Sequence, residues 1–386
     1  MTDTAMMEPL SHSDTPHGLV FSLGYRLAPG TGLAFITSST ARAPQSTSGT
    51  FHEQSVDSIQ FLLDTTARVS GDARISKTRR YMTSGRGHRT PKTREIWENM
   101  LGTPLPASTA LEVPGTSLQD SVIDLEAWAA VPSGSLAADI VRVPGRGLLP
   151  DAVAVRGDQQ LCAAVVQPEP GDRVDAELLS CLERLTEKFE ACGAGDRDVL
   201  KLTVYYRDPR SWPVIEAMIA GRFGAHSPVV SGIVVSNLEA VGGHVQVTGW
   251  ARCARGADAA PGCGTVDLRQ RLCTLTGTGA LPIFSGGEAA DMYQQLPPAT
   301  IEEQTHLGME NQRKVLESAG ATFDDVFRSN WYLTDIRDWD VAQPIIASYF
   351  PHGVIPAPIA VEVSRLTAKQ GVRIEPDLWA AVPADR

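Results

Sequence analysis

Apolar and polar positions in the last third of the chain follow two different periods. Residues 326–333 alternate as a half-buried strand does, and residues 280–287 form a short apolar run that closes in a Ser-Gly turn. Between them, Thr300 is followed three residues later by Glu303, which indicates a capping box, and Gly320 stands where a helix C-cap belongs. The pattern therefore predicts a strand, a long helix and a second strand.

The same order of elements returns in the earlier parts of the chain. It reads β–β–α–β–α–β–β over about 120 residues, which predicts an α+β unit with helices on one face of a mixed sheet. Residues 152–155 are expected to form a strand that pairs with 160–166. Further helices are predicted over 55–69, 175–191, 212–222 and 339–349, and further strands over 33–37, 200–206, 232–235, 245–251, 359–363 and 372–381.

Three landmarks keep their spacing through three copies of this pattern. Trp128, Trp250 and Trp379 are separated by 122 and 129 residues, and a proline precedes them by 22, 22 and 23 residues. A period of this length, about a third of the chain, indicates globular units and not solenoid turns. We predict domains over 1–133, 134–257 and 258–386. The prolines are Pro106, Pro228 and Pro356, and tyrosines lie upstream of them at Tyr81, Tyr205 and Tyr332.

Composition describes an ordinary protein with enough apolar residues for several cores. Hydrophobic residues make up 42% and charged residues 20% of the 386 residues, and the net charge is −11. That acidic balance argues against binding to nucleic acid or to an anionic membrane through overall positive charge. The sequence shows neither a secretion signal nor an apolar run of membrane-spanning length, so we expect a cytoplasmic protein with reduced cysteines.

The third copy carries a resemblance to a known family. Its segments Glu303-Gln304-Thr305, Leu316-Glu317-Ser318-Ala319-Gly320, Asp324-Asp325-Val326, Tyr332-Leu333-Thr334-Asp335 and Tyr349-Phe350 resemble the RidA/YjgF superfamily of small enamine/imine deaminases. The first copy carries similar Pro-Ala and Ile-Asp-Leu-Glu-Ala segments from 106 and 123. Members of that superfamily assemble as homotrimers. The resemblance therefore implies three fused RidA-like (chorismate-mutase-like) domains in a pseudo-threefold trimer, active as a single chain.

The resemblance does not extend to the expected substrate clamp. Active members use the arginine of a Pro-x-Arg motif to hold a substrate carboxylate with two parallel hydrogen bonds. Ser108, Val230 and Pro358 occupy that position here. We therefore do not expect an ordinary 2-iminopropanoate deaminase.

Two acids are the candidate catalytic residues. The family position in the Glu-Ile-Glu-Ala motif corresponds to Glu126 in the first copy and Asp377 in the third, and we match it to Gly249 in the second. Burial between domains is expected to raise the pKa of such an acid and make it a general acid or base. The alternative is an acid at a solvated or salt-bridged strand edge. The first copy is the expected centre of the activity.

Residues 74–94 carry nine basic side chains and no acidic one. We interpret most of this run as a solvated loop. Arg94 is the exception, because it can supply the guanidinium that is missing at Ser108. Nucleic-acid binding is disfavoured, since no aromatic residues are interleaved for stacking.

Further substrate-binding candidates follow from the resemblance: Ser108, Thr109, Ser285 and Gln343. No metal-binding or phosphate-binding motif is present, and no cofactor is expected. The sequence thus predicts a diverged small-molecule enzyme with its site at an inter-domain cleft. It is expected to be a hydrolase, deaminase or lyase that acts on an imine, enamine or related polar metabolite of a biosynthetic pathway. A non-catalytic ligand-binding or chaperone-like pseudoenzyme stays open as the alternative.

Overall fold

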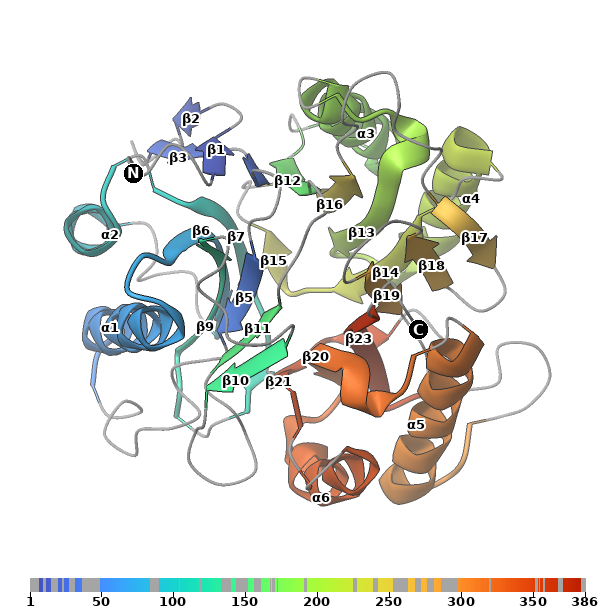
Figure 1. Cartoon of the computed structure of the whole chain (residues 1–386). Helices are drawn as coiled ribbons and strands as arrows, with labels where there is room; N and C mark the ends of the chain where they lie inside the picture. Colours follow the sequence, from blue (N-terminus) through green and yellow to red (C-terminus); the bar gives the residue numbers. More distant parts are fainter. Residues whose placement is uncertain are drawn as a thin grey trace.

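In the computed structural model, three α+β units follow one another along the chain and surround a common centre (Figure 1). Unit 1 contains β5 to β9, unit 2 contains β12 to β16, and unit 3 contains β19 to β23. The structure describes residues 7–9, 12–14, 20–22, 24–27, 32–36, 49–83, 90–103, 105–117, 120–132, 140–143, 152–155, 161–166, 168, 171, 173–190, 193–224, 228–238, 242–252, 263–267, 272–275, 281–285, 297–318, 321–350, 353, 355–356, 358–366 and 371–382.

Each unit repeats one order of elements, as the sequence predicts. Unit 1 consists of β5 (Gly32–Ile36), α1 (Phe51–Val69), β6 (Arg74–Met82), α2 (Pro91–Leu101), β7 (Ala107–Glu112), β8 (Gly115–Thr116) and β9 (Ile123–Val131). Unit 2 consists of β12 (Leu161–Val166), α3 (Val174–Glu190), β13 (Val199–Tyr206), α4 (Trp212–Phe223), β14 (Val229–Val234), β15 (Asn237–Leu238) and β16 (Val245–Arg252). Unit 3 consists of β19 (Leu281–Ser285), α5 (Ile301–Ser318), β20 (Val326–Leu333), α6 (Trp339–Tyr349), β21 (Pro358–Glu362), β22 (Arg365–Leu366) and β23 (Ile374–Val382).

The helix caps predicted from sequence are present where the structure describes them. The hydroxyl of Thr300 accepts a hydrogen bond from the amide of Glu303, whose carboxylate accepts one from the amide of Thr300. Thr50 and Glu53 form the same capping box at the start of α1. The C-cap expected at Gly320 lies outside the described residues.

The core strands have the same order in all three sheets. They run β5-β9-β6-β7, β12-β16-β13-β14 and β19-β23-β20-β21. The pairs β6–β7, β13–β14 and β20–β21 are parallel, and α2, α4 and α6 form the crossovers between them. The helix pairs lie at the periphery and the sheets face the centre (Figure 1). The predicted mixed sheet with helices on one face is confirmed.

A short strand from each unit pairs with the sheet of another unit. β15 of unit 2 pairs with β7 of unit 1, β22 of unit 3 pairs with β14 of unit 2, and β8 of unit 1 pairs with β21 of unit 3. The three additions form a closed cycle. The units are therefore arranged with pseudo-threefold symmetry, as the sequence repeat predicts.

The strands that precede the first two units are exchanged between their sheets. β11 (Ala152–Val155) pairs with β5 of unit 1, and β4 (Gly24–Leu27) pairs with β12 of unit 2. The predicted pairing of 152–155 with 160–166 is therefore wrong. In unit 3, by contrast, the hairpin that precedes it in sequence, β17 (Cys263–Asp267) and β18 (Leu272–Leu275), pairs with the unit's own strand β19. The other strands outside the units are β1 (Met7–Pro9), β2 (His12–Asp14), β3 (Val20–Ser22) and β10 (Ile140–Val143).

The predicted domain limits at 133 and 257 stay a prediction. In space, the exchange carries strands from each side of residue 133 into the sheet of the other unit. The limit at residue 133 therefore divides the sequence, but the sheets of units 1 and 2 each contain strands from both sides of it.

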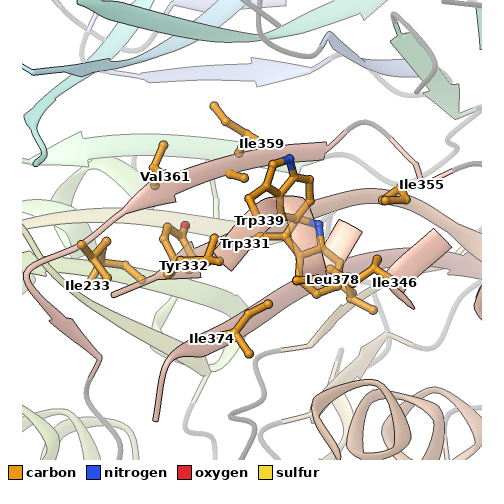
Figure 2. Packing of buried hydrophobic residues seen from close by; sticks show 14 of the residues in the cluster. Ile233, Trp331, Tyr332, Trp339, Ile346, Ile355, Ile359, Val361, Ile374 and Leu378 are labelled. Atoms are coloured by element: carbon orange, nitrogen blue, oxygen red, sulfur yellow. The ribbon is translucent and has the colours of Figure 1, made fainter. Parts of the chain in front are cut away.

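The apolar cluster centred on unit 3 continues into the neighbouring units, while units 1 and 2 also have clusters of their own. Trp331 and Ile359 lie on strands of unit 3, and Trp339 and Ile346 lie on α6. Figure 2 shows Ile233 of unit 2 at the edge of this cluster, on the side of Tyr332 and Val361. Tyr81 and Leu111 of unit 1 belong to the same cluster. Burial of shared apolar surface therefore holds the units together.

Candidate functional site

The three repeated tryptophans lie at equivalent positions and meet at the centre. Trp128, Trp250 and Trp379 lie on β9, β16 and β23, each the last strand of its unit. The ring centroids of Trp128 and Trp250 are 6.2 Å apart, and those of Trp250 and Trp379 are 5.2 Å apart. The sequence repeat is thus a spatial repeat. We call these three residues the tryptophan trio.

A basic side chain lies across the strand from each member of the trio. Lys77 is paired in register with Trp128, Lys201 with Trp250, and Arg328 with Trp379. All three cations are almost inaccessible to solvent. The Nζ atom of Lys77 lies 4.5 Å from the ring centroid of Trp128, and the Cζ atom of Arg328 lies 4.7 Å from those of Trp128 and Trp379. Desolvated contacts of this kind are attractive because the ring face is electron-rich.

Glu126 is held by two arginines from different units. Nη2 of Arg328 donates to both carboxylate oxygens of Glu126, at 3.0 and 2.8 Å, and Arg79 forms a short ion pair with Oε1. Nη1 of Arg79 also donates to the hydroxyl of Tyr205, at 2.6 Å. All four side chains are buried. This Glu126 cluster (Arg79, Glu126, Tyr205 and Arg328) therefore draws on all three units.

The electrostatics of this cluster keep Glu126 ionised. Burial acts to raise the pKa of Glu126, but Arg328 and Arg79 outweigh it and hold the pKa below its usual value. The expectation that burial raises this pKa is therefore wrong. Burial raises the pKa of Tyr205, against the opposing charge of Arg79, so Tyr205 keeps its proton. Tyr205, and not Glu126, is the proton-bearing group of the cluster.

Asp377 has an equivalent place in a second cluster. Its carboxylate accepts from Lys201 at 3.1 Å, from the hydroxyl of Ser231 at 3.3 Å and from the indole of Trp379 at 3.2 Å. Nζ of Lys201 also donates to Ser231, at 2.8 Å. We call Lys201, Ser231 and Asp377 the Asp377 cluster. It joins units 2 and 3.

The third equivalent junction contains hydroxyls in place of a carboxylate. Lys77 donates to the hydroxyl of Thr109 at 3.2 Å, and the hydroxyls of Thr109 and Thr248 are 3.3 Å apart. Thr248 stands two residues before Trp250, as Glu126 and Asp377 stand two residues before their tryptophans. The match of Gly249 to that position is therefore wrong by one residue. Gly249 is instead the residue whose Cβ would meet Leu185 of α3 at 2.8 Å.

The other candidate residues do not gather at one place. Arg94 is on the exposed side of α2, where it pairs with Glu98 at 3.0 Å. Ser108 accepts a hydrogen bond from Thr78 at 3.1 Å on the strand pair β6–β7, and Gln343 is a half-buried residue of α6. Ser285 ends β19, and its side chain lies outside the described part of the structure. Only Thr109 joins the acids at the centre.

The interpretation of the basic run as a solvated loop is wrong for residues 74–82. These residues form β6, in which Lys77, Arg79 and Arg80 are buried. The signal for this was present in the repeat. A cation stands four residues before each repeated tyrosine, at Lys77, Lys201 and Arg328. Alignment on the tyrosines would have identified these inward-facing residues.

The described residues contain neither a candidate metal site nor a helix that could span a membrane. Among them, no group of three His, Cys, Asp or Glu side chains could hold a metal ion. Within the same residues, no helix is long and apolar enough to cross a bilayer. Cys181 is a buried free thiol, and burial raises its pKa to about 12. Such a thiol is a packing residue and not a nucleophile.

Comparison with the sequence models of known families gives a match in the last third of the chain. The sequence model of the family described as Endoribonuclease L-PSP matches residues 271–382. A RutC family protein of Saccharolobus solfataricus is 47% identical over 66 residues, which are 17% of this chain and 52% of that protein. The mitochondrial protein mmf2 of Schizosaccharomyces pombe is 33% identical over 100 residues, 26% of this chain and 79% of its own. The chain thus spans about half the length of the first of these relatives.

One solved structure resembles most of the chain. A crystal structure of a chorismatase superposes with a TM-score of 0.52 at 15% sequence identity, covering 80% of this chain and 93% of the other. The likeness concerns the fold alone, and it extends across all three units. A single chain with this architecture is therefore found elsewhere.

Proposed function

Because the chain belongs to the RidA/YjgF superfamily, which includes its RutC family relatives, we propose that it is a small-molecule enzyme working at the centre where its three units meet. The proposed substrate is an imine, enamine or related polar metabolite that carries a carboxylate. The reaction is a hydrolysis, deamination or elimination. The proposal depends on one observation above all, the two arginines that converge on Glu126.

These arginines offer what the family motif lacks in this chain. Ser108, Val230 and Pro358 leave no guanidinium at the Pro-x-Arg position, while Arg79 and Arg328 place two guanidinium groups around one carboxylate. A planar guanidinium recognises a carboxylate through parallel hydrogen bonds. Glu126 forms ion pairs with both of these arginines. A substrate carboxylate would compete for the same donors.

Burial of the Glu126 cluster supports a functional reading. A buried ion pair adds little net stability, because desolvation offsets the attraction between its charges. Ionisable groups with perturbed pKa values concentrate at functional sites. In this cluster, ionised Glu126 would stabilise an iminium cation, and Tyr205 would donate a proton to a leaving or accepting atom. The likeness to a chorismatase does not select among reactions, since one fold hosts many.

A binding experiment with unreactive analogues tests the proposal. Calorimetric titration with pyruvate, a 2-oxo analogue of the proposed imines, is expected to show binding, while hydroxyacetone, which lacks the carboxylate, is not. Arg328→Lys keeps the charge but loses the fork of donors, so pyruvate affinity should fall at least tenfold. Arg373→Lys is the matched control, because Arg373 pairs with Asp338 away from the cluster. Equal binding of both compounds, or no effect of Arg328→Lys, would contradict the proposal.

A non-catalytic ligand-binding role is the second candidate. The observation in its favour is that Glu126 already forms an ion pair with both arginines, so a substrate carboxylate would have to displace it. Ammonia release from imines generated in solution distinguishes the two roles. Pyruvate binding without turnover of any imine in a panel of chain lengths would favour the binding protein.

The cellular setting expected from the sequence also stays a proposal. We propose a cytoplasmic, monomeric protein without a cofactor. The relative mmf2 is named as mitochondrial, so relatives do not share one compartment.

A further inference from the structure

The three equivalent junctions differ in one chemical respect. Arg328 faces Glu126 and Lys201 faces Asp377, whereas Lys77 faces Thr109 and Thr248. No carboxylate of the described residues lies within ion-pairing distance of Lys77. Lys77 is nevertheless as buried as its counterparts, with 1% of its surface exposed. It is therefore a buried amine with a hydroxyl and an indole as its nearest partners.

An ammonium group is poorly accommodated at this position. Two cations, Arg79 on the same strand β6 and Arg328 on β20, repel a charge on Lys77, and among the described residues Glu126 of β9 attracts it. Burial first, then these arginines, lower the pKa of Lys77 well below its usual value. Burial also lowers the pKa of Lys201, but there Asp377 opposes the shift through direct contact. The two lysines occupy equivalent positions, but Lys201 contacts a carboxylate and Lys77 contacts a hydroxyl.

Lys77 also lies beside the proposed carboxylate clamp. Lys77 and Arg79 are two residues apart on one strand, so their side chains emerge on the same face of the sheet. Nζ of Lys77 and Cζ of Arg328 both lie within 5 Å of the ring of Trp128, at 4.5 and 4.7 Å. A small 2-oxo acid held by Arg79 and Arg328 would place its carbonyl carbon next to this amine.

We infer that Lys77 is a nucleophilic amine that forms an imine with the carbonyl group of a small 2-oxo acid. The lone pair of Nζ attacks the carbonyl carbon, and a proton passes from nitrogen to oxygen to give a carbinolamine. Loss of one water molecule then gives the imine, with no oxidant or reductant needed. Uncharged lysines in low-dielectric surroundings carry out this chemistry. The inference rests on the proposed function, since the clamp orients the carbonyl.

Reductive trapping tests the inference, and the chain supplies its own control. The full-length protein is incubated with pyruvate and sodium cyanoborohydride, and modified lysines are located by peptide mass spectrometry. We expect modification of Lys77 at least tenfold faster than that of Lys201. Exposed Lys92 reports the non-specific rate. Modification of Lys77 no faster than that of Lys201, or none at all, would overturn the inference.

A reciprocal exchange of partners sharpens the result. Thr248→Asp gives Lys77 the acid that Lys201 has, and trapping at Lys77 should fall at least tenfold. Asp377→Thr removes the acid from Lys201 and should raise trapping there. If Asp377→Thr does not fold, Thr248→Asp decides alone. Unchanged trapping at Lys77 in folded Thr248→Asp contradicts the role given to the missing carboxylate.

Calorimetry separates this inference from the proposed function. Pyruvate binding with no trapping at Lys77 refutes the imine and leaves the proposed function intact. Absence of pyruvate binding refutes the proposed clamp itself. Trapping at Lys77 together with binding that Arg328→Lys weakens supports both.

Discussion

At the residue scale, the centre of this protein contains charged side chains that are buried away from solvent. Surface pairs such as Arg337 with Asp335 are screened by solvent and contribute little. The Glu126 cluster differs, because each charge depends on its partner for solvation. Removing one partner leaves the others uncompensated. The buried acids are therefore the sensitive positions of the chain.

Glu126→Gln is expected to lower the free energy of unfolding by about 3–5 kcal/mol at neutral pH, because it strands two buried guanidinium groups. Urea unfolding followed by circular dichroism measures the change. Arg94→Ala is the control, since it removes an exposed pair in α2 and should cost about 0.3–0.5 kcal/mol. A Glu126→Gln effect no larger than that of Arg94→Ala would show that the cluster carries no such energy.

The pH dependence of that difference has a defined sign. The pKa of Glu126 is lower in the folded protein than in the unfolded chain, so its stabilising contribution is complete above the unfolded pKa, roughly 4.3. It is lost as the pH falls through the folded pKa. The stability gap between the wild-type protein and Glu126→Gln should thus be constant from pH 6 to 8 and should shrink progressively as the pH falls below the unfolded pKa. A gap that widens on acidification would refute the assignment.

Hydrolysis of 2-iminopropanoate is expected to be negligible in the wild-type protein. Ser108, Val230 and Pro358 stand where the superfamily's motif has its arginine, and the arginines proposed as the clamp are already paired with Glu126. Loss of one partner of a buried charge pair costs on the order of 2–5 kcal/mol. A coupled assay for pyruvate release checks this. Turnover at the rate of a RidA deaminase run in parallel would contradict it, and would mean that the clamp at Arg79 and Arg328 replaces the motif fully.

At the scale of elements, the first helix of each unit packs on a central strand of its sheet, α1 on β9, α3 on β16 and α5 on β23. In unit 2, β16 crosses α3 at Gly249, where a Cβ would lie 2.8 Å from Leu185 and 3.0 Å from Phe189. Glycine is needed at this place for close approach of strand and helix, and not for its backbone freedom. The same strand carries Thr248 on its opposite face toward the centre. Packing on one face thus fixes the position of the polar groups on the other.

Gly249→Ala is expected to destabilise the protein by about 1–3 kcal/mol, because the added methyl group forces Leu185 and Phe189 apart. Urea unfolding measures this. Gly221→Ala in α4 is the matched control. No atom lies within 4 Å of its added Cβ, so the change should stabilise the helix by roughly 0.5–1 kcal/mol. Equal effects of both substitutions would remove the packing argument.

At the scale of the whole molecule, each unit's sheet receives its added strand from another unit of the same chain. β8, β15 and β22 each complete the sheet of another unit within one chain. The exchange of β4 and β11 links units 1 and 2 further. Contacts that a homotrimer makes between subunits are thus intramolecular in this protein.

The protein is therefore expected to be monomeric, with a mass of 41.4 kDa by size-exclusion chromatography with light scattering. Its mass should not change on dilution, because the contacts among units do not depend on concentration. A concentration-dependent mass at a multiple of that value would show that a further face is used for association.

The sequence alone determined the repeated architecture of the three units, but not the exchange of β4 and β11 between two of their sheets. The spacing of Trp128, Trp250 and Trp379, the capping box at Thr300 and the alternation in 326–333 are local or repeated signals, and all of them agree with the structure. Such signals depend on the chain's own period, so they need no knowledge of distant contacts. Glu126, Asp377 and Thr109 were identified differently, from the resemblance to the RidA/YjgF superfamily.

Only the tertiary structure decided which charges are buried and which groups they meet. Arg79 and Lys77 look like members of a solvated basic run, but β6 is the strand that faces the other two units. Glu126 meets Arg328, which is 202 residues away, and Lys77 meets no acid at all among the described residues. Burial and pairing arise from contacts between units, and no local pattern records them. For the same reason, the sequence could place Glu126 at the centre but could not set the direction of its pKa.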